Sequence, residues 1–155
     1  MWADPRVTAH IGGRPLTREE TWRNLQRYAG HWALFGWGYF TVRDAATAAF
    51  LGEVGCMDSR RDTQPSFEGV PETGWAFVPA HHGRGLAGEA MAALLAWTDE
   101  RGMGRTVCIV DPDNGPSIRL ANRLGYASAG EIRYRDASTL LFERRAGTGS
   151  EWQLE

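Results

Sequence analysis

A glycine-rich turn is the stretch of this chain whose residue types and spacing most clearly indicate chemistry. It reads His82-Gly83-Arg84-Gly85-Leu86-Ala87-Gly88 and lies between a short apolar stretch and a helix-forming run that reaches Trp97. Backbone N–H groups in such a turn point the same way, and the positive end of the following helix adds to their attraction for anions. The turn therefore predicts a cradle for a diphosphate or a similar anion.

Three alternative interpretations of this stretch must be considered: a Walker loop, a dinucleotide-binding turn and a purely structural turn. A Walker loop requires Lys and then Ser or Thr after its last glycine, whereas Gly88 is followed by Glu89. A dinucleotide fingerprint requires an acidic residue after the next strand, a place that Asp111 roughly fills, but the antiparallel hairpins predicted around it argue against that fold. Taken alone, the turn is also consistent with a purely structural role.

The elements that must position the turn follow from the apolar pattern. A strand is predicted over residues 72–78, before the turn, and a helix after it that ends at Gly102. Residues 105–110 form a continuous apolar run, as in a strand covered on both faces. Asn114 can cap a helix that contains residues 118–124.

The chain before residue 72 predicts a helix and a hairpin. Residues 1–15 have no regular period and are expected to be loop. Thr17 and Glu20 form a capping-box pattern, and the helix that they begin is expected to end at Gly30. Its expected apolar face holds Trp22, Leu25 and Ala29.

Aromatic and β-branched residues then predict two antiparallel strands, within residues 32–43 and 49–57. The polar residues 58–70 are expected to form a long loop near a ligand. Residues 126–133 and 138–143 predict a second hairpin, and residues 146–155 a frayed tail. The whole predicts one α/β domain over residues 1–155 with a mixed sheet.

Composition narrows the class of protein. Of the 155 residues, 43% are hydrophobic and 23% charged, as in a globular domain, and the net charge of −2 gives no reason to expect nucleic acid or a membrane surface as a partner. The two cysteines, Cys56 and Cys108, lack the spacing and companion histidines of a zinc site, so no metal is expected. Free thiols in the cytoplasm are the favoured interpretation, and a single disulfide is the alternative.

Two motifs together resemble a known family. The stretch ETGWAFVPAHHGRGLAGEA and the later DPDNGPSIRLANRLGY resemble the GNAT superfamily of acyl-CoA-dependent N-acetyltransferases, and within it the RimJ/RimL branch of ribosomal-protein N-terminal acetyltransferases. His82 departs from the Arg or Gln usual at the first position of the turn. The resemblance implies a GNAT-like acyl-CoA N-acyltransferase fold that lacks the usual first strand. It also implies a sheet edge that a second copy of the chain could cover as a homodimer.

The implied reaction is direct transfer of an acetyl group from acetyl-CoA, as co-substrate, to a primary amine in a ternary complex. The acceptor would be a peptide or protein N-terminal α-amine or a small-molecule amine. A non-catalytic acyl-CoA-binding or regulatory module is the alternative.

The resemblance also assigns residues to the co-substrate. The backbone of the turn would hold the pyrophosphate, and Phe77 and Val78 would pair with the pantetheine arm. Asn114 would hydrogen-bond the pantetheine, and Arg123 could reach the adenosine phosphate. The complete predicted set is Phe77, Val78, His82, Gly83, Arg84, Gly85, Leu86, Ala87, Gly88, Asn114, Ser117 and Arg123.

Four residues are candidates for the chemical step. The Phe77 amide would stabilise the developing oxyanion, and Ser117 would stabilise the leaving thiolate. Glu72, at the start of its strand, and Glu53, on the neighbouring one, are the candidate general bases. Partial burial of a carboxylate raises its pKa towards the range useful for this role.

Overall fold

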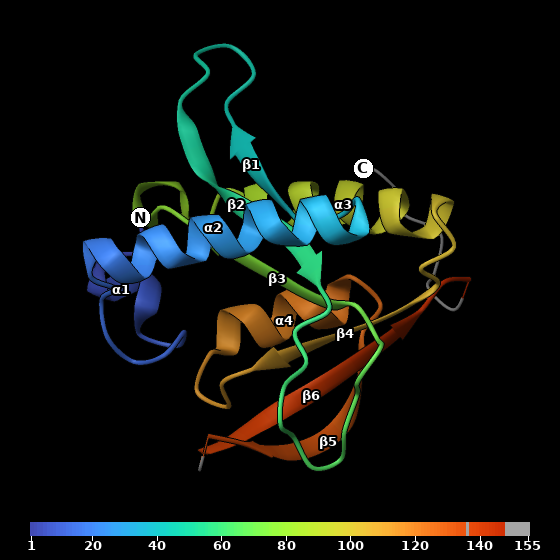
Figure 1. Ribbon diagram of the computed structural model, residues 1–155. Helices are drawn as coiled ribbons and strands as arrows, with labels where there is room; N and C mark the ends of the chain where they lie inside the picture. Colours follow the sequence, from blue (N-terminus) through green and yellow to red (C-terminus); the bar gives the residue numbers. More distant parts are fainter. Residues whose placement is uncertain (136, 148–155) are drawn as a thin grey trace. The chain divides into compact units, whose positions relative to one another are not determined.

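The computed structural model describes residues 1–135 and 137–147, and the chain forms two compact units (Figure 1). The first consists of residues 1–57 and 73–94, and the second of residues 58–72 together with the chain from residue 95 onward. The single domain expected over residues 1–155 stays a prediction. The expected tail, 146–155, lies outside the described residues except for 146 and 147.

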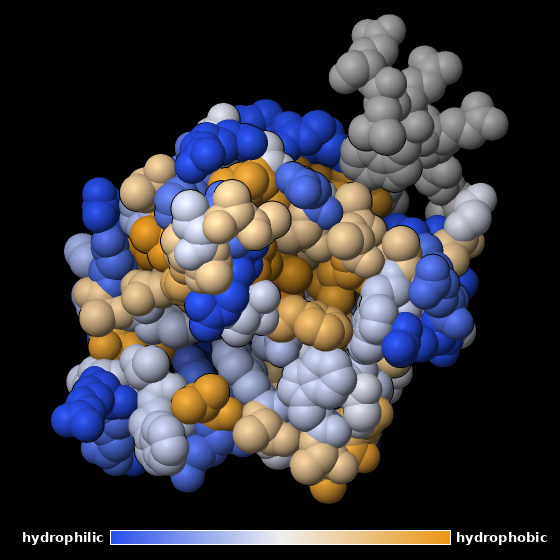
Figure 2. Space-filling view, turned by 90° about the horizontal axis from the view of Figure 1, so that it is seen from above, coloured by the Kyte–Doolittle hydropathy of each residue, from blue (hydrophilic) through white to orange (hydrophobic). Residues whose placement is uncertain are grey.

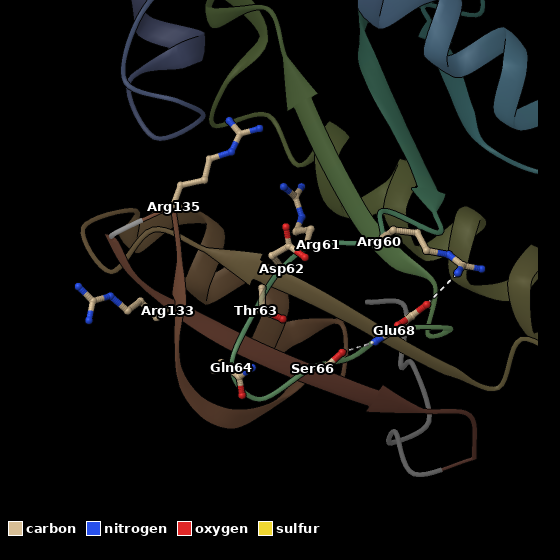
Figure 3. Close-up of a pocket in the computed structure, with 9 residues that line it drawn as sticks. All are labelled: Arg60, Arg61, Asp62, Thr63, Gln64, Ser66, Glu68, Arg133 and Arg135. Carbon is tan, nitrogen blue, oxygen red and sulfur yellow. Dashed lines mark hydrogen bonds and ion pairs between the residues drawn. The ribbon is translucent and has the colours of Figure 1, made fainter.

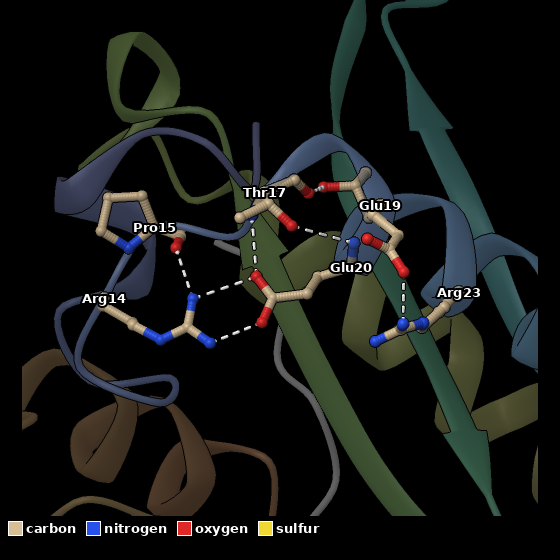
Figure 4. A network of polar contacts seen from close by, with 7 residues as sticks. Arg14, Pro15, Thr17, Glu19, Glu20 and Arg23 are labelled. Atoms are coloured by element: carbon tan, nitrogen blue, oxygen red, sulfur yellow. Dashed lines mark hydrogen bonds and ion pairs between the residues drawn. The ribbon is translucent and has the colours of Figure 1, made fainter.

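Two helices precede the first strand. Helix α1 (Pro5–Thr8) lies within the segment expected to be loop, so that prediction was wrong here. The Asp4 carboxylate accepts a hydrogen bond from the Arg6 amide at 2.9 Å, and Pro5 occupies the first turn, which together start a helix. Helix α2 (Arg18–Phe35) begins with the predicted capping box of Thr17 and Glu20, which is confirmed (Figure 4).

Helix α2 continues through Gly30 to Phe35 and ends where Gly36 adopts the left-handed conformation, with φ of 70°. The predicted end at Gly30 and the predicted strand from residue 32 were therefore wrong. A glycine at the residue after a helix satisfies the last carbonyls, whereas a glycine inside one only lowers its stability.

The face of α2 that packs on the sheet is also different from the predicted one. Trp22 and Leu25 are 58% and 54% exposed. Tyr28 instead stacks on Tyr39 of β1, and the Trp32 indole donates to the Tyr39 carbonyl at 3.0 Å.

The first unit continues with the predicted antiparallel hairpin, which is confirmed. Strand β1 (Tyr39–Arg43) pairs with β2 (Phe50–Met57), and Thr41 lies opposite Glu53. Strand β3 (Glu72–Phe77) leads through the single turn η1 (Pro79–His81) and the glycine turn into α3 (Leu86–Glu100). The buried apolar residues of this unit include Leu51, Val54, Ala76, Phe77 and Met91.

The second unit contains the other predicted elements, which are confirmed. Strand β4 (Arg105–Val110) pairs antiparallel with β6 (Ala137–Arg145), and β6 pairs antiparallel with β5 (Ala127–Tyr134). Helix α4 (Gly115–Arg123) follows β4. Phe67, Val107, Ile132 and Leu141 form a buried cluster within this unit.

Hydrogen bonds between strands give the order β1-β2-β3-β4-β6-β5. The pair β3–β4 is parallel, with Glu72 opposite Val107 in the second unit, and the other pairs described above are antiparallel. The expected mixed α/β sheet is confirmed, and β1 stands at the end of the strand order. Among the described residues, no helix combines the length and apolar character needed to span a membrane.

Candidate functional site

The glycine turn joins β3 to α3 and presents an open backbone. Gly83 and Gly85 have φ of 72° and 79°, a region that side chains with a Cβ rarely adopt. No heavy atom lies within 4 Å of the position that a Cβ would take at either glycine. Helix α3 begins at Leu86 immediately after the turn, with the Glu89 amide bonded to the Gly85 carbonyl at 3.1 Å. A ligand can therefore approach the main chain closely at the positive end of a 15-residue helix.

Two side chains of the turn make local contacts. The His82 Nε2 donates to the Phe77 carbonyl at 2.9 Å and so fastens the turn to the end of β3. The Arg84 guanidinium lies 3.2 Å from the Nδ1 of His81 and is exposed. His82 therefore has a structural contact for its ring, while its backbone belongs to the turn.

The backbone of Val78 is already engaged. Its amide donates to the Leu51 carbonyl at 2.9 Å, and its carbonyl accepts from the His81 amide at 2.9 Å. The pairing of Val78 with the pantetheine arm therefore stays a prediction, and its N–H group already has a partner within the protein.

Gly52 permits the close approach of β2 to the end of β3. A Cβ at Gly52 would lie 2.4 Å from the Ala76 carbonyl oxygen and 2.9 Å from the Cα of Phe77, so no other residue fits without backbone movement. Residues 51–53 of β2 thus run beside the last residues of β3, from which the glycine turn follows.

Glu53 is a partly buried carboxylate beside an uncharged donor. The Tyr28 hydroxyl donates to its Oε1 at 2.6 Å. Burial raises the pKa of Glu53 above its usual value, and the Tyr28 hydroxyl, the Trp2 indole and the charge of Arg27 oppose that rise. The Trp2 Nε1–H is buried and forms no hydrogen bond of regular geometry, so Tyr28 supplies the better-defined contact. A carboxylate in this setting can accept a proton.

Tyr39 holds Tyr28 in place. The two rings stack with centroids 4.7 Å apart and planes 8° apart. Gly55 and Gly74 leave room for Tyr39, because a Cβ at Gly55 would lie 2.4 Å from its Cα and one at Gly74 would lie 2.2 Å from its hydroxyl. These glycines therefore determine where the Tyr28 hydroxyl meets Glu53.

A cavity of about 1030 Å³ opens beside this pair, within the first unit. Its walls are mainly aromatic and aliphatic and come from the N-terminal segment, α2 and the β1–β2 hairpin. They include Trp2, Leu16, Trp22, Leu25, Tyr28 and Glu53.

Glu72 is held in a different way, in the second unit. Its side chain is buried, and both of its oxygens accept from Arg61, at 2.6 and 2.8 Å. The Arg61 guanidinium also lies over the Tyr134 ring, 4.6 Å from its centroid. Such a bidentate pair occupies both carboxylate oxygens and fixes the orientation of the side chain.

The second motif lies on α4. The Asn114 side chain caps this helix by accepting from the Ser117 amide at 3.2 Å, which confirms the predicted cap. Ser117 lies in the first turn and is half-buried. Arg123 is exposed in the last turn, at the opposite end of α4 from Asn114.

The second unit also has a polar cavity of about 630 Å³ between the loop after β2 and the β5–β6 hairpin (Figure 3). Four arginines line it: Arg60, Arg61, Arg133 and Arg135. Two of them are neutralised locally, because Arg60 pairs with Asp58 and Glu68, and Arg61 with Glu72.

Sequence reasoning missed the partners that distinguish the two glutamates. Tyr28 lies three residues after Leu25 and four before Trp32, and this helical spacing was the available signal. Arg61 lies in a loop with no period, so nothing in the sequence pairs it with Glu72. Among the described residues, no group of three or more His, Cys, Asp or Glu could hold a metal ion.

Comparison with known proteins agrees with this arrangement. Residues 1–127 match the acetyltransferase (GNAT) domain family. A protein from Bordetella pertussis described as a GNAT-family acetyltransferase is 38% identical, with 90% of this chain and 84% of that chain covered and a TM-score of 0.80. The Bacillus subtilis protein YkkB, whose function is uncharacterized, is 29% identical over 94% of this chain and 83% of its own length.

A third relative is similar in fold alone. The acetyltransferase yncA from Salmonella typhimurium, solved with its cofactor acetyl-CoA, is 19% identical, with 92% of this chain and 80% of that chain covered and a TM-score of 0.67. The family match covers residues 1–127 of the 155, and the Bordetella protein is 38% identical over most of both chains. The chain belongs to the GNAT acetyltransferase family.

Proposed function

We propose that this protein transfers an acetyl group from acetyl-CoA to a primary amine by direct attack in a ternary complex, with Glu53 as the general base. The observation that carries the proposal lies within the first unit. Strand β2 brings Glu53 beside the end of β3, and β3 leads directly into an open glycine turn at the start of α3.

The residues of the turn fit the pyrophosphate of acetyl-CoA. Gly83 and Gly85 leave the space outside the backbone open, where bulkier residues would fill it. The turn also precedes the positive end of α3. Arg84 is exposed and can add a positive charge to the backbone amides of His82–Gly88. When bound, acetyl-CoA supplies the activated thioester.

The protein's own groups would then manage charge and protons. The Phe77 amide would donate to the thioester oxygen as negative charge develops on it. The amine nitrogen forms its bond to the acetyl carbon as the carbon–sulfur bond breaks. Glu53 takes the proton that the amine loses, and the thiolate leaves and is protonated from solvent.

Glu72 and the residues on α4 keep narrower proposed roles. Because Arg61 occupies both oxygens of Glu72, we assign this carboxylate to positioning and prefer Glu53 as the base. The Asn114 side chain caps α4 through its oxygen and retains N–H donors for a pantetheine carbonyl. Ser117 remains the proposed donor to the thiolate, and Arg123 a proposed contact for the adenosine phosphate.

The test of this function measures CoA binding by calorimetry and thiol release from acetyl-CoA with a panel of amines. Gly85→Asp is expected to weaken CoA binding at least about tenfold, equivalent to ~1.4 kcal/mol, because it places a negative charge in the cradle. Gly85→Asn is the matched control, since it has the same size and backbone strain without the charge. Equal effects of the two substitutions would contradict an anion site.

Binding of CoA without thiol release on any amine would favour the alternative, a non-catalytic acyl-CoA-binding module. Both measurements use the wild-type protein, and free CoA is the ligand in the binding measurement.

Three finer assignments belong to the same proposal. The RimJ/RimL resemblance suggests an N-terminal α-amine as the acceptor, and the cytoplasm is the proposed location because Cys56 and Cys108 are free thiols. Because β1 ends the strand order, we also propose that a second copy pairs along it. Sedimentation that gives only a monomer mass at all concentrations would reject the dimer.

A further inference from the structure

Large apolar side chains are exposed on α2, whereas the solvent-facing side of an amphipathic helix normally carries polar residues. Trp22 and Leu25 are 58% and 54% exposed and three residues apart, so they are neighbours on one helix face. Figure 2 shows that apolar residues reach the surface among hydrophilic ones on one face of the molecule. Exposed apolar groups that line a hollow are typical of binding sites.

These two residues form one wall of the cavity of about 1030 Å³ in the first unit. Trp2 and Leu16 form another wall, and the Leu16 amide donates to the Trp2 carbonyl at 2.9 Å, which fixes the two residues to each other. The size is at the upper end of the usual range for small-molecule sites, about 300–1,000 Å³. The cavity can therefore hold a ligand with a sizeable apolar group.

The charge inside the cavity selects the kind of polar group. Glu53 lines it, and in the described part of the chain no arginine forms an ion pair with this carboxylate. Its hydrogen-bond partner is the uncharged Tyr28 hydroxyl. A carboxylate in an apolar setting is stabilised by a cation that enters with the ligand. The lining also holds Arg18 and Glu19, and the positive charges of Arg27 and the N-terminus act on Glu53. The cavity thus combines an apolar wall with a carboxylate that has no salt-bridge partner among the described residues.

We propose that this cavity is the acceptor site and that its substrate is a primary amine attached to an aromatic or branched aliphatic group. The ammonium approaches Glu53, and the apolar group packs against Trp22 and Leu25. The assignment of the cavity to the acceptor rests on the proposed function. The ligand class itself rests on the cavity alone and is tested by binding.

The test uses 2-phenylethylamine and ethylamine as probes, with the full chain. In calorimetry without acetyl-CoA, 2-phenylethylamine is expected to bind with a Kd at least about tenfold lower than that of ethylamine. The reason is that burial of the ring contributes well over ~1.4 kcal/mol. In the thiol-release assay, kcat/KM should favour 2-phenylethylamine by a similar factor. Trp22→Ala should remove most of this preference by raising KM for 2-phenylethylamine more than KM for ethylamine.

Leu34→Ala is the matched control. Leu34 lies on the same helix, is 79% exposed and does not line the cavity, so its truncation should leave the preference intact. Binding of 2-phenylethylamine without turnover would support the ligand class and reject the proposed function. Turnover of both amines with equal kcat/KM would reject the ligand class and leave the proposed function intact. Failure of 2-phenylethylamine to bind, or a dimer that Trp22→Ala dissociates, would overturn the inference.

Discussion

Glu53 and Glu72 are both poorly exposed carboxylates on neighbouring strands of the order, yet their partners differ. In the first unit, Glu53 accepts a hydrogen bond from the neutral Tyr28 hydroxyl at 2.6 Å, and burial raises its pKa. In the second unit, Glu72 accepts two hydrogen bonds from the Arg61 guanidinium. The partner therefore decides the role: the first carboxylate can accept a proton, and the second has both of its oxygens occupied by a guanidinium.

The largest expected effect concerns the ion pair. Arg61→Ala leaves Glu72 buried without a counter-charge and is expected to lower the free energy of unfolding by about 3–5 kcal/mol. Urea denaturation measures this change. Arg60→Ala is the control next to it, because Arg60 is exposed and its surface pairs should contribute about 1 kcal/mol or less. Equal losses in the two variants would show that Arg61 has no special role.

A smaller effect is expected when Glu53 loses its neutral partner. The Tyr28 hydroxyl lowers the pKa of Glu53, so Tyr28→Phe should raise that pKa further. The acidic limb of kcat/KM should then move to higher pH. In a Glu53→Gln background the same substitution should not move the profile. A shift of the limb to lower pH would contradict the assigned contact.

The smallest effect concerns the helix that carries Tyr28. Thr17 caps α2 by accepting from the Glu20 amide at 3.2 Å, and Glu20 accepts in return from the Thr17 amide at 2.8 Å. Thr17→Ala is expected to reduce the free energy of unfolding by about 1 kcal/mol, and Thr17→Ser should retain most of it. Thermal unfolding of the pair measures the difference. An alanine variant as stable as wild type would show that the cap is not needed.

The sequence predicted local features well and long-range pairings poorly. The capping box of Thr17, the cap at Asn114 and both hairpins depend on residues close in the chain, and the structure confirms them. The end of α2 was misplaced because Gly30 and Gly36 are equally plausible stops, and packing against β1 decides between them.

In the candidate site, too, local features could be predicted and long-range contacts could not. The glycine turn could be predicted because its conformation is encoded by consecutive residues. The contacts of Glu53 with Tyr28 and of Glu72 with Arg61 join residues far apart in sequence, and only the folded chain shows which carboxylate has the neutral partner.

The most direct test of the central claim is the pH dependence of kcat/KM for thiol release, measured in wild type, Glu53→Gln and Glu72→Gln. Because the deprotonated form of Glu53 is the base and burial raises its pKa, wild-type activity should rise with pH through an acidic limb above the usual range for glutamate. Glu53→Gln should lose that limb and about 10²–10⁴-fold of the rate, whereas Glu72→Gln should keep the limb. A limb that survives in Glu53→Gln and disappears in Glu72→Gln would contradict the account.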